Sequence, residues 1–182
     1  MRRALVALAI IPLLLLNSAC GPGMDTYEGA LDSDREAREK MMTALGLMRD
    51  AGALAESEPE LAERKRGEAV DAYVVALASW ADAEEVYRGL IERFPGDPTY
   101  LNNLANLLYS KALSGLDPNL EGLGEAERLM DEALARHDSG IFRRNLELIE
   151  TLRGDEETAR TVEDNVALVE ELARLARAAE PS

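Results

Sequence analysis

The chain has 182 residues, of which 47% are hydrophobic and only 4% aromatic, with 35 acidic against 20 basic side chains and a formal net charge of −15. Such an acidic surface repels nucleic acid, which excludes nucleic-acid binding, and it would complement a partner with a basic patch unless the charge serves solubility alone. Because aromatic residues are few, Ala, Leu and Val must fill the core, which favours close-packed helices in a single domain.

The N-terminal segment has the three parts of an export signal: a basic start, an apolar stretch and small residues before a cleavage site. The apolar stretch, Ala4 to Leu16, has 13 residues. As a helix it would span about 20 Å, too little for a hydrocarbon core of about 30 Å. Cys20, the only cysteine of the chain, directly follows the small residues. We therefore expect residues 1–19 to be a signal peptide.

The sequence Ser18-Ala19-Cys20 resembles the lipobox of bacterial lipoproteins. The resemblance implies cleavage before Cys20, diacylglycerol on its thiol and acylation of the new N-terminus, so that only lipid binds the membrane. Asn17 departs from the family, which usually has Leu there; the alternative is a secreted or soluble periplasmic protein cut at Ala19. Gly21 replaces the Asp that often keeps lipoproteins at the inner membrane. In a cell with two membranes this implies the outer membrane, with the protein facing the periplasm.

The remaining sequence is predicted to be helical nearly throughout. Residues 20–32 contain Gly and Asp and predict a flexible tether after the lipidated cysteine. The spacing of Ser33 and Glu36 is that of a capping box, which begins a predicted N-terminal helix over 33–56. Further helices follow over 57–182, interrupted by a loop near 114–122. No window alternates with period two, so no strand is expected.

Seven predicted helices of similar length raise the question of internal repeats. Val70 is followed by a small residue, Ala78, at a turn, by an aromatic residue, Trp80, and by a second small residue, Ala83. This pattern resembles the tetratricopeptide repeat, and Leu104 follows Val70 by 34 residues, which is the period of that family.

The match extends toward the C-terminus with one insertion. Ala126 follows Ala83 by 43 residues, and the nine extra residues correspond to the loop near 114–122, while Ala159 follows Ala126 by 33. The resemblance implies an all-α fold, a short right-handed α-solenoid of about three helix pairs over 57–182 with an extra N-terminal helix. The alternative is a non-repeat helical bundle of structural role, because helical periodicity alone imitates a repeat.

A repeat of this kind implies a concave groove, lined by the first helix of each pair, that binds a protein partner. The outward-facing candidates are Asn102, Asn103, Asn106 and Tyr109 in the middle pair and Arg144 in the third. Asn side chains both donate and accept hydrogen bonds, which suits an extended peptide. The alternative is a polar helix face that only contacts solvent.

Catalytic chemistry has little support in the sequence. His137 is the only histidine, which excludes a multi-histidine metal site and leaves a His-based triad without a second candidate. Among 35 carboxylates, close acidic pairs arise by chance. No phosphate-binding loop is expected, because no strand precedes one. We therefore predict no enzyme, no catalytic residues, no metal and no cofactor.

The combined prediction is a membrane-anchored lipoprotein that acts as a protein-binding scaffold or adaptor in the bacterial cell envelope. The alternative is a small-ligand-binding or transport-accessory lipoprotein, for which Met41, Met42 and Met48 are the one indication. The heptad-like stripe of the last helix, which begins at Val162 and Val166, would either cap the array or pair with a second copy of the protein.

Overall fold

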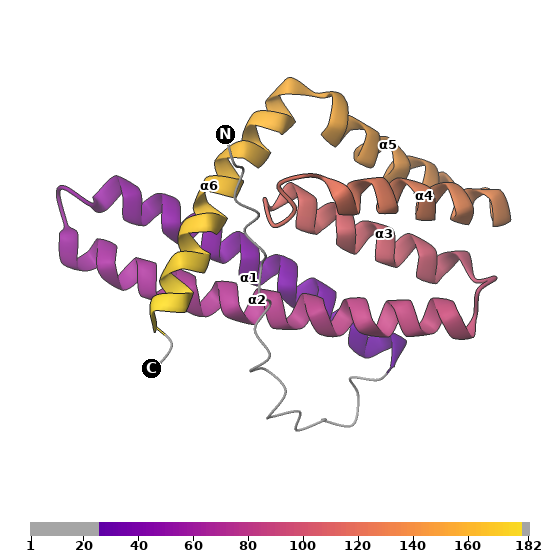
Figure 1. The fold of residues 1–182 in the computed structure, drawn as a ribbon, viewed down its shortest axis with the longest axis horizontal. Coiled ribbons are helices and arrows are strands. Elements are labelled where there is room, and N and C mark those ends of the chain that lie inside the picture. The colour runs from indigo at the N-terminus through magenta and orange to yellow at the C-terminus, as the bar shows by residue number, and fades with distance from the viewer. Residues whose placement is uncertain (1–25, 180–182) are drawn as a thin grey trace, which may run out of the picture.

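The structure is a computed structural model that describes residues 26–179, and this range is all-helical, as expected. Its six helices are α1 (Tyr27–Leu54), α2 (Pro59–Arg93), α3 (Pro98–Leu113), α4 (Glu121–Arg136), α5 (Gly140–Gly154) and α6 (Glu156–Ala179). Figure 1 shows α1 and α2 as a long antiparallel pair, with α3, α4 and α5 stacked beside one half of it. The last helix, α6, runs back across α1 and α2.

Small residues hold α1 and α2 close together. Ala37 and Ala44 of α1 are completely buried, as are Ala69, Ala76 and Ala83 of α2. Because an alanine side chain ends at Cβ, the two backbones approach closely and each helix buries one stripe along its length. This pair therefore provides much of the core, and its end near α3 continues into the core of the remaining helices.

The first helix begins earlier than the sequence suggested. Its N-cap is Thr26, whose Oγ1 accepts a hydrogen bond from the backbone N–H of Gly29 at 3.1 Å. The prediction that the tether extends to residue 32 and the helix starts at Ser33 is therefore wrong. The reason is tertiary: Ala30 and Asp34 are buried, and the contact of this first stretch with α2 outweighs the low helix propensity of its Gly and Asp residues.

The predicted turn at Ala78 is also wrong, because this residue lies inside α2, a single helix of 35 residues. Two side chains at this point bind α1: Ser79 Oγ donates to Oε2 of Glu36 at 3.2 Å, and Trp80 Nε1 donates to Oδ1 of Asp34 at 3.2 Å. No proline interrupts α2 after its first turn. Since α1 packs against α2 on both sides of this point, one long helix replaces the first predicted helix pair.

The α3–α4 pair and the loop that joins it agree with the sequence. Asp97 caps α3, accepting from the N–H of Thr99 at 2.8 Å. The backbone then leaves the helix over residues 114–120, inside the predicted interruption. Asp117 in this loop accepts from the N–H groups of Glu121 at 3.2 Å and Gly122 at 2.8 Å, and so caps α4.

A tight contact between this loop and α6 fixes the last helix. Gly115 has a φ of +84°, and a Cβ built on it would lie 2.5 Å from the backbone nitrogen of Val166. Beside it, the buried side chain of Asn165 donates to the carbonyl of Leu113 at 2.9 Å and accepts from Nη2 of Arg49 at 2.5 Å. One α6 residue thus joins the end of α3 to α1.

The apolar stripe of α6 is used within the molecule. Val162, Val169 and Leu172 are buried, and Val166 is half-buried against the core. The stripe therefore packs on the other helices. Ala159, which the repeat alignment places with the fully buried Ala126, is exposed. The close helix–helix contact that the repeat pattern predicts at Ala159 is therefore absent.

Candidate functional site

The predicted lipidation site, Cys20, lies outside the described residues, as does the whole of the predicted signal segment 1–19. Within residues 26–179, none of the helices combines the length and the hydropathy that crossing a membrane requires.

Two of the predicted groove residues form a polar network inside the protein. Asn102, only 7% exposed, donates to Oδ1 of Asn103 at 3.1 Å and accepts from Nδ2 of Asn145 at 2.8 Å. Asn103 in turn donates to the hydroxyl of Tyr27 at 3.0 Å. The network links α1, α3 and α5. The prediction that Asn102 faces outward is wrong, because its side-chain amide is buried and forms hydrogen bonds with Asn103 and with Asn145 of α5.

The other two candidates on α3 are partly buried. The backbone carbonyl of Asn106 accepts from Oγ of Ser110 at 2.8 Å. Tyr109 is half-buried against the core, and this burial raises the pKa of its phenol. Neither residue lies beside Arg144 in the hollow described next. The structure therefore does not gather the predicted set into one groove.

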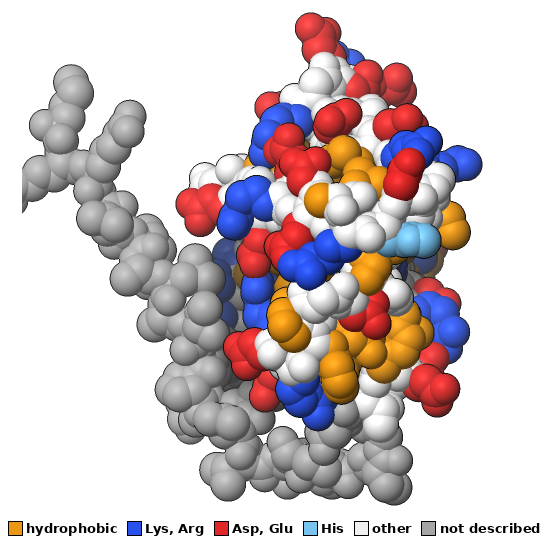
Figure 2. Space-filling model, turned by 90° about the vertical axis from the view of Figure 1, so that its right-hand side faces the viewer, with side chains coloured by type: hydrophobic (Ala, Val, Ile, Leu, Met, Phe, Trp, Pro, Cys, Tyr) orange, Lys and Arg blue, Asp and Glu red, His pale blue; other side chains and the backbone are white. Residues whose placement is uncertain are grey.

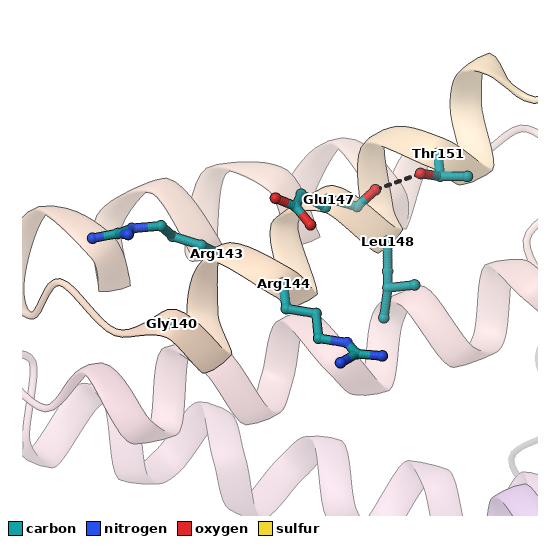
Figure 3. A pocket seen from close by; sticks show the side chains of 6 residues that line it. All are labelled: Gly140, Arg143, Arg144, Glu147, Leu148 and Thr151. Carbon is teal, nitrogen blue, oxygen red and sulfur yellow. Dashed lines mark hydrogen bonds between the residues drawn. The ribbon is translucent and has the colours of Figure 1, made fainter.

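The side of α5 that contacts solvent has the clearest binding features. A shallow hollow there is lined by Gly140, Arg143, Arg144, Glu147, Leu148 and Thr151. Figure 3 shows Arg144 and Leu148 pointing to the same side of α5, while Arg143 and Glu147 point elsewhere. Leu148 is 44% exposed, a high value for a large apolar side chain. We call Arg144 and Leu148 the α5 surface.

The two arginines of this hollow differ in their partners. Arg143 binds the carboxylate of Asp138, with Nε donating at 2.8 Å, and the pKa of Asp138 is lowered by this hydrogen bond. Among the ion pairs within residues 26–179, none includes Arg144. Its guanidinium, which offers five N–H donors, is therefore open to an incoming carboxylate or carbonyl.

A network of four charged side chains joins α2, α3 and α4 near the core. Arg88 donates to both carboxylate oxygens of Glu125, at 2.7 and 3.1 Å, and to Glu84 at 2.8 Å. Lys111 donates to the other oxygen of Glu84 at 2.8 Å. Burial raises the pKa of Glu84, but the hydrogen bonds from Lys111 and Arg88 outweigh it and lower the pKa. Each charged side chain is paired with another member of the network, so the network joins the helices and leaves no member free for a ligand.

A second polar cluster lies between α1 and α2. Asp34 is buried, accepts from Trp80 and from Arg38 Nε at 3.1 Å, and is thereby satisfied. The hydroxyl of Tyr87 is buried with no hydrogen-bond partner among the described residues. Burial, with the nearby Asp34 carboxylate, raises the pKa of Tyr87. In the sequence Asp34 stands only within a capping-box pattern, and no local pattern signals a contact 46 residues away.

Metal binding has no candidate site in the part of the protein that the structure describes. No group of three or more His, Cys, Asp or Glu side chains lies in a position to hold a metal ion within residues 26–179. His137 packs edge-on against Phe142, with ring centroids 6.1 Å apart.

Comparison with protein-family models, curated proteins and solved structures gave no match to this protein.

Proposed function

We propose that the protein is a lipoprotein of the bacterial cell envelope, held at a membrane by lipid on Cys20. The observation that carries the anchor is the placement of the only cysteine directly after a basic start, an apolar stretch and two small residues. With Gly21 after the cysteine, we assign the protein to the periplasmic side of the outer membrane where the cell has two membranes. Two or three acyl groups hold a protein stably, whereas one does not.

The α3–α4 pair is the part of the protein that we propose to be tetratricopeptide-like. Leu104, Ala105 and Ala126, which the resemblance places in the packing core of the repeat, are all buried. Small residues at such places let antiparallel helices approach closely. The first unit is replaced by the α1–α2 pair, so the array would be short.

Within this frame we propose that the α5 surface binds a protein partner. An unpaired guanidinium beside an exposed leucine fits a segment that offers a carboxylate next to an apolar side chain, as acidic peptides and protein C-termini do. The hollow beside it is open, which suits a protein segment better than an enclosed small ligand. The adaptor function is therefore favoured over the transport-accessory alternative.

Site-specific photo-crosslinking in cells tests both parts of this proposal. A photoreactive residue in place of Leu148 should give a discrete adduct with another protein, whereas the same residue in place of Met42, which is exposed on α1, should not. Adding Arg144→Ala should reduce the Leu148 adduct, and the matched change of an exposed arginine on α6, Arg160→Ala, should leave it intact. Adducts of equal yield at both positions would contradict the assignment of the α5 surface.

The anchor is tested separately by fractionation. Cys20→Ser should move the protein from the membrane fraction to the soluble fraction, because the thiol that receives the lipid is removed. Unchanged fractionation would refute the lipoprotein assignment while leaving the crosslinking result informative about the partner.

A further inference from the structure

Three aromatic rings from different segments meet at the end of the molecule where α1 begins. The rings of Tyr27 and Tyr100 are in edge-on contact with centroids 5.4 Å apart, and Tyr100 contacts Phe94 at 6.0 Å. Phe94 remains 52% exposed. The α2–α3 loop thus presents an aromatic side chain to solvent beside the first residue of α1.

The neighbouring α4–α5 turn adds a second apolar side chain. Ile141 is 69% exposed, the highest value among the exposed large hydrophobic residues of the described range. The two turns are adjacent, because a Cβ built on Gly96 would lie 3.7 Å from Nη1 of Arg136. Figure 1 places both turns at the same end as the start of α1, and Figure 2 views this end, where hydrophobic side chains gather. We call Tyr27, Phe94, Tyr100 and Ile141 the terminal patch.

Two acidic side chains near the terminal patch are paired with arginines, whereas the exposed Glu28 and Glu92 form no ion pair among the described residues. Asp138 forms an ion pair with Arg143, and Glu132 forms one with Arg136 at 2.5 Å. The carboxylate of Asp97 is engaged as the cap of α3. In a protein with a net charge of −15, this end therefore repels a membrane surface less than an unpaired acidic surface would.

The short sequence between Cys20 and α1 limits the distance between this end of the molecule and the proposed anchor. Tyr27 is the seventh residue after Cys20, so the two lie at most about 25 Å apart when the chain between them is fully extended. From Tyr27, the 28 residues of α1 extend about 42 Å toward the α1–α2 turn. A lipid on Cys20 therefore keeps the terminal patch near the membrane, whereas the α1–α2 turn can stand well away from it.

We propose that the terminal patch lies against the membrane surface, with Phe94 and Ile141 in the headgroup region and the α1–α2 pair directed away from the bilayer. This inference rests on the proposed lipid anchor. An aromatic side chain with a polar tip, such as Tyr100, favours the boundary between headgroups and hydrocarbon, where one end is apolar and the other hydrated. The anchor supplies the attachment, and the patch sets the orientation.

Single cysteine labels on the lipid-modified protein test the orientation. In the mature lipoprotein the Cys20 thiol is consumed by the lipid, so a thiol-reactive fluorophore labels only a cysteine introduced elsewhere. Three exposed positions serve: Ile141→Cys in the patch, Met42→Cys midway along α1 and Glu56→Cys at the α1–α2 turn. Each protein is reconstituted in phosphatidylcholine vesicles that contain a headgroup-linked quencher.

The expected result is loss of fluorescence at position 141 and unchanged fluorescence at position 56, with position 42 close to 56. Loss at all three positions would indicate a molecule lying on its side, and no loss at position 141 in protein that floats with the vesicles would show a free end. Either outcome overturns the inference and leaves the anchor intact. If the protein fails to float and Cys20 itself takes the label, the anchor is refuted and the inference with it.

Discussion

Substituting Gly115 with alanine tests how α6 is held on the rest of the fold. Gly115 has a φ of +84°, in a region that residues with a side chain rarely adopt. Its added Cβ would lie 2.5 Å from the nitrogen of Val166 and 2.7 Å from the carbonyl carbon of Asn165. Both atoms belong to the α6 backbone, so no rotamer change relieves the overlap.

The cost of this change has two parts. A residue other than glycine in such a backbone conformation costs about 1–3 kcal/mol. Relieving the overlap moves the loop and α6 apart by about 1 Å, which brings the closest contact from 2.5 Å to an ordinary distance. The hydrogen bond of 2.9 Å between Asn165 and Leu113 is then broken, and a buried polar group left unsatisfied costs about 1–3 kcal/mol. Gly115→Ala should therefore lower the free energy of unfolding by about 2–6 kcal/mol.

Equilibrium unfolding monitored at the only tryptophan, the buried Trp80, measures the change. For a protein of this size the expected loss lowers Tm by about 4–24 °C. Gly67→Ala is the matched control: Gly67 lies inside α2 with nothing within 4 Å of the added Cβ, so this variant should gain about 0.5–1 kcal/mol. If Gly115→Ala matches the wild-type protein or gains stability like the control, the account of the α6 contact is wrong.

Three further variants test the polar groups. Asn102→Ala should lower the free energy of unfolding by about 1–3 kcal/mol, because it leaves the half-buried amide of Asn145 without its acceptor; thermal denaturation measures the loss. Tyr87→Phe should leave the free energy of unfolding unchanged or raise it by up to about 1 kcal/mol, because it removes a buried hydroxyl that has no partner among the described residues. If urea denaturation shows a loss above about 1 kcal/mol, the hydroxyl forms a hydrogen bond and this reasoning is wrong. Arg88→Met should destabilise by about 0.5–1 kcal/mol at pH 7 and by less at pH 3. The pKa of Glu84 is lowered in the folded state, so its contribution is complete above the unfolded value near 4.5 and disappears as the pH falls through the folded value; an equal loss at both pH values in urea titrations would contradict this.

Local signals predicted the elements that depend on local chemistry. Asp97 followed by Pro98 is a local signature of a helix start, and both the cap and the helix are present. The loop over 114–120 was predicted from the break in helical periodicity. In both cases the deciding interactions lie within a few residues, so the sequence pattern contains them.

The errors occurred where distant contacts decide. A turn was predicted at Ala78 because the repeat alignment puts a small residue there, yet the next two side chains, Ser79 and Trp80, both bind α1 and the helix continues. Asn102 was placed on an outer face, but its partner Asn145 lies 43 residues away. Polar residues on a helix look alike in sequence whether they meet solvent or another helix, and only the tertiary packing separates the two cases.

The position of α6 determines what these helix pairs can do. In an open array each unit contacts only its neighbours, so the last helix packs on the preceding pair. Here α6 contacts α1, α2, α3 and α5, and Asn165 bonds to both Arg49 and Leu113. Contacts between the first and last helices couple their stabilities. Unfolding should therefore be a single cooperative transition. By contrast, α5 buries only Ile149 and Leu152, so much of its surface is left for a partner.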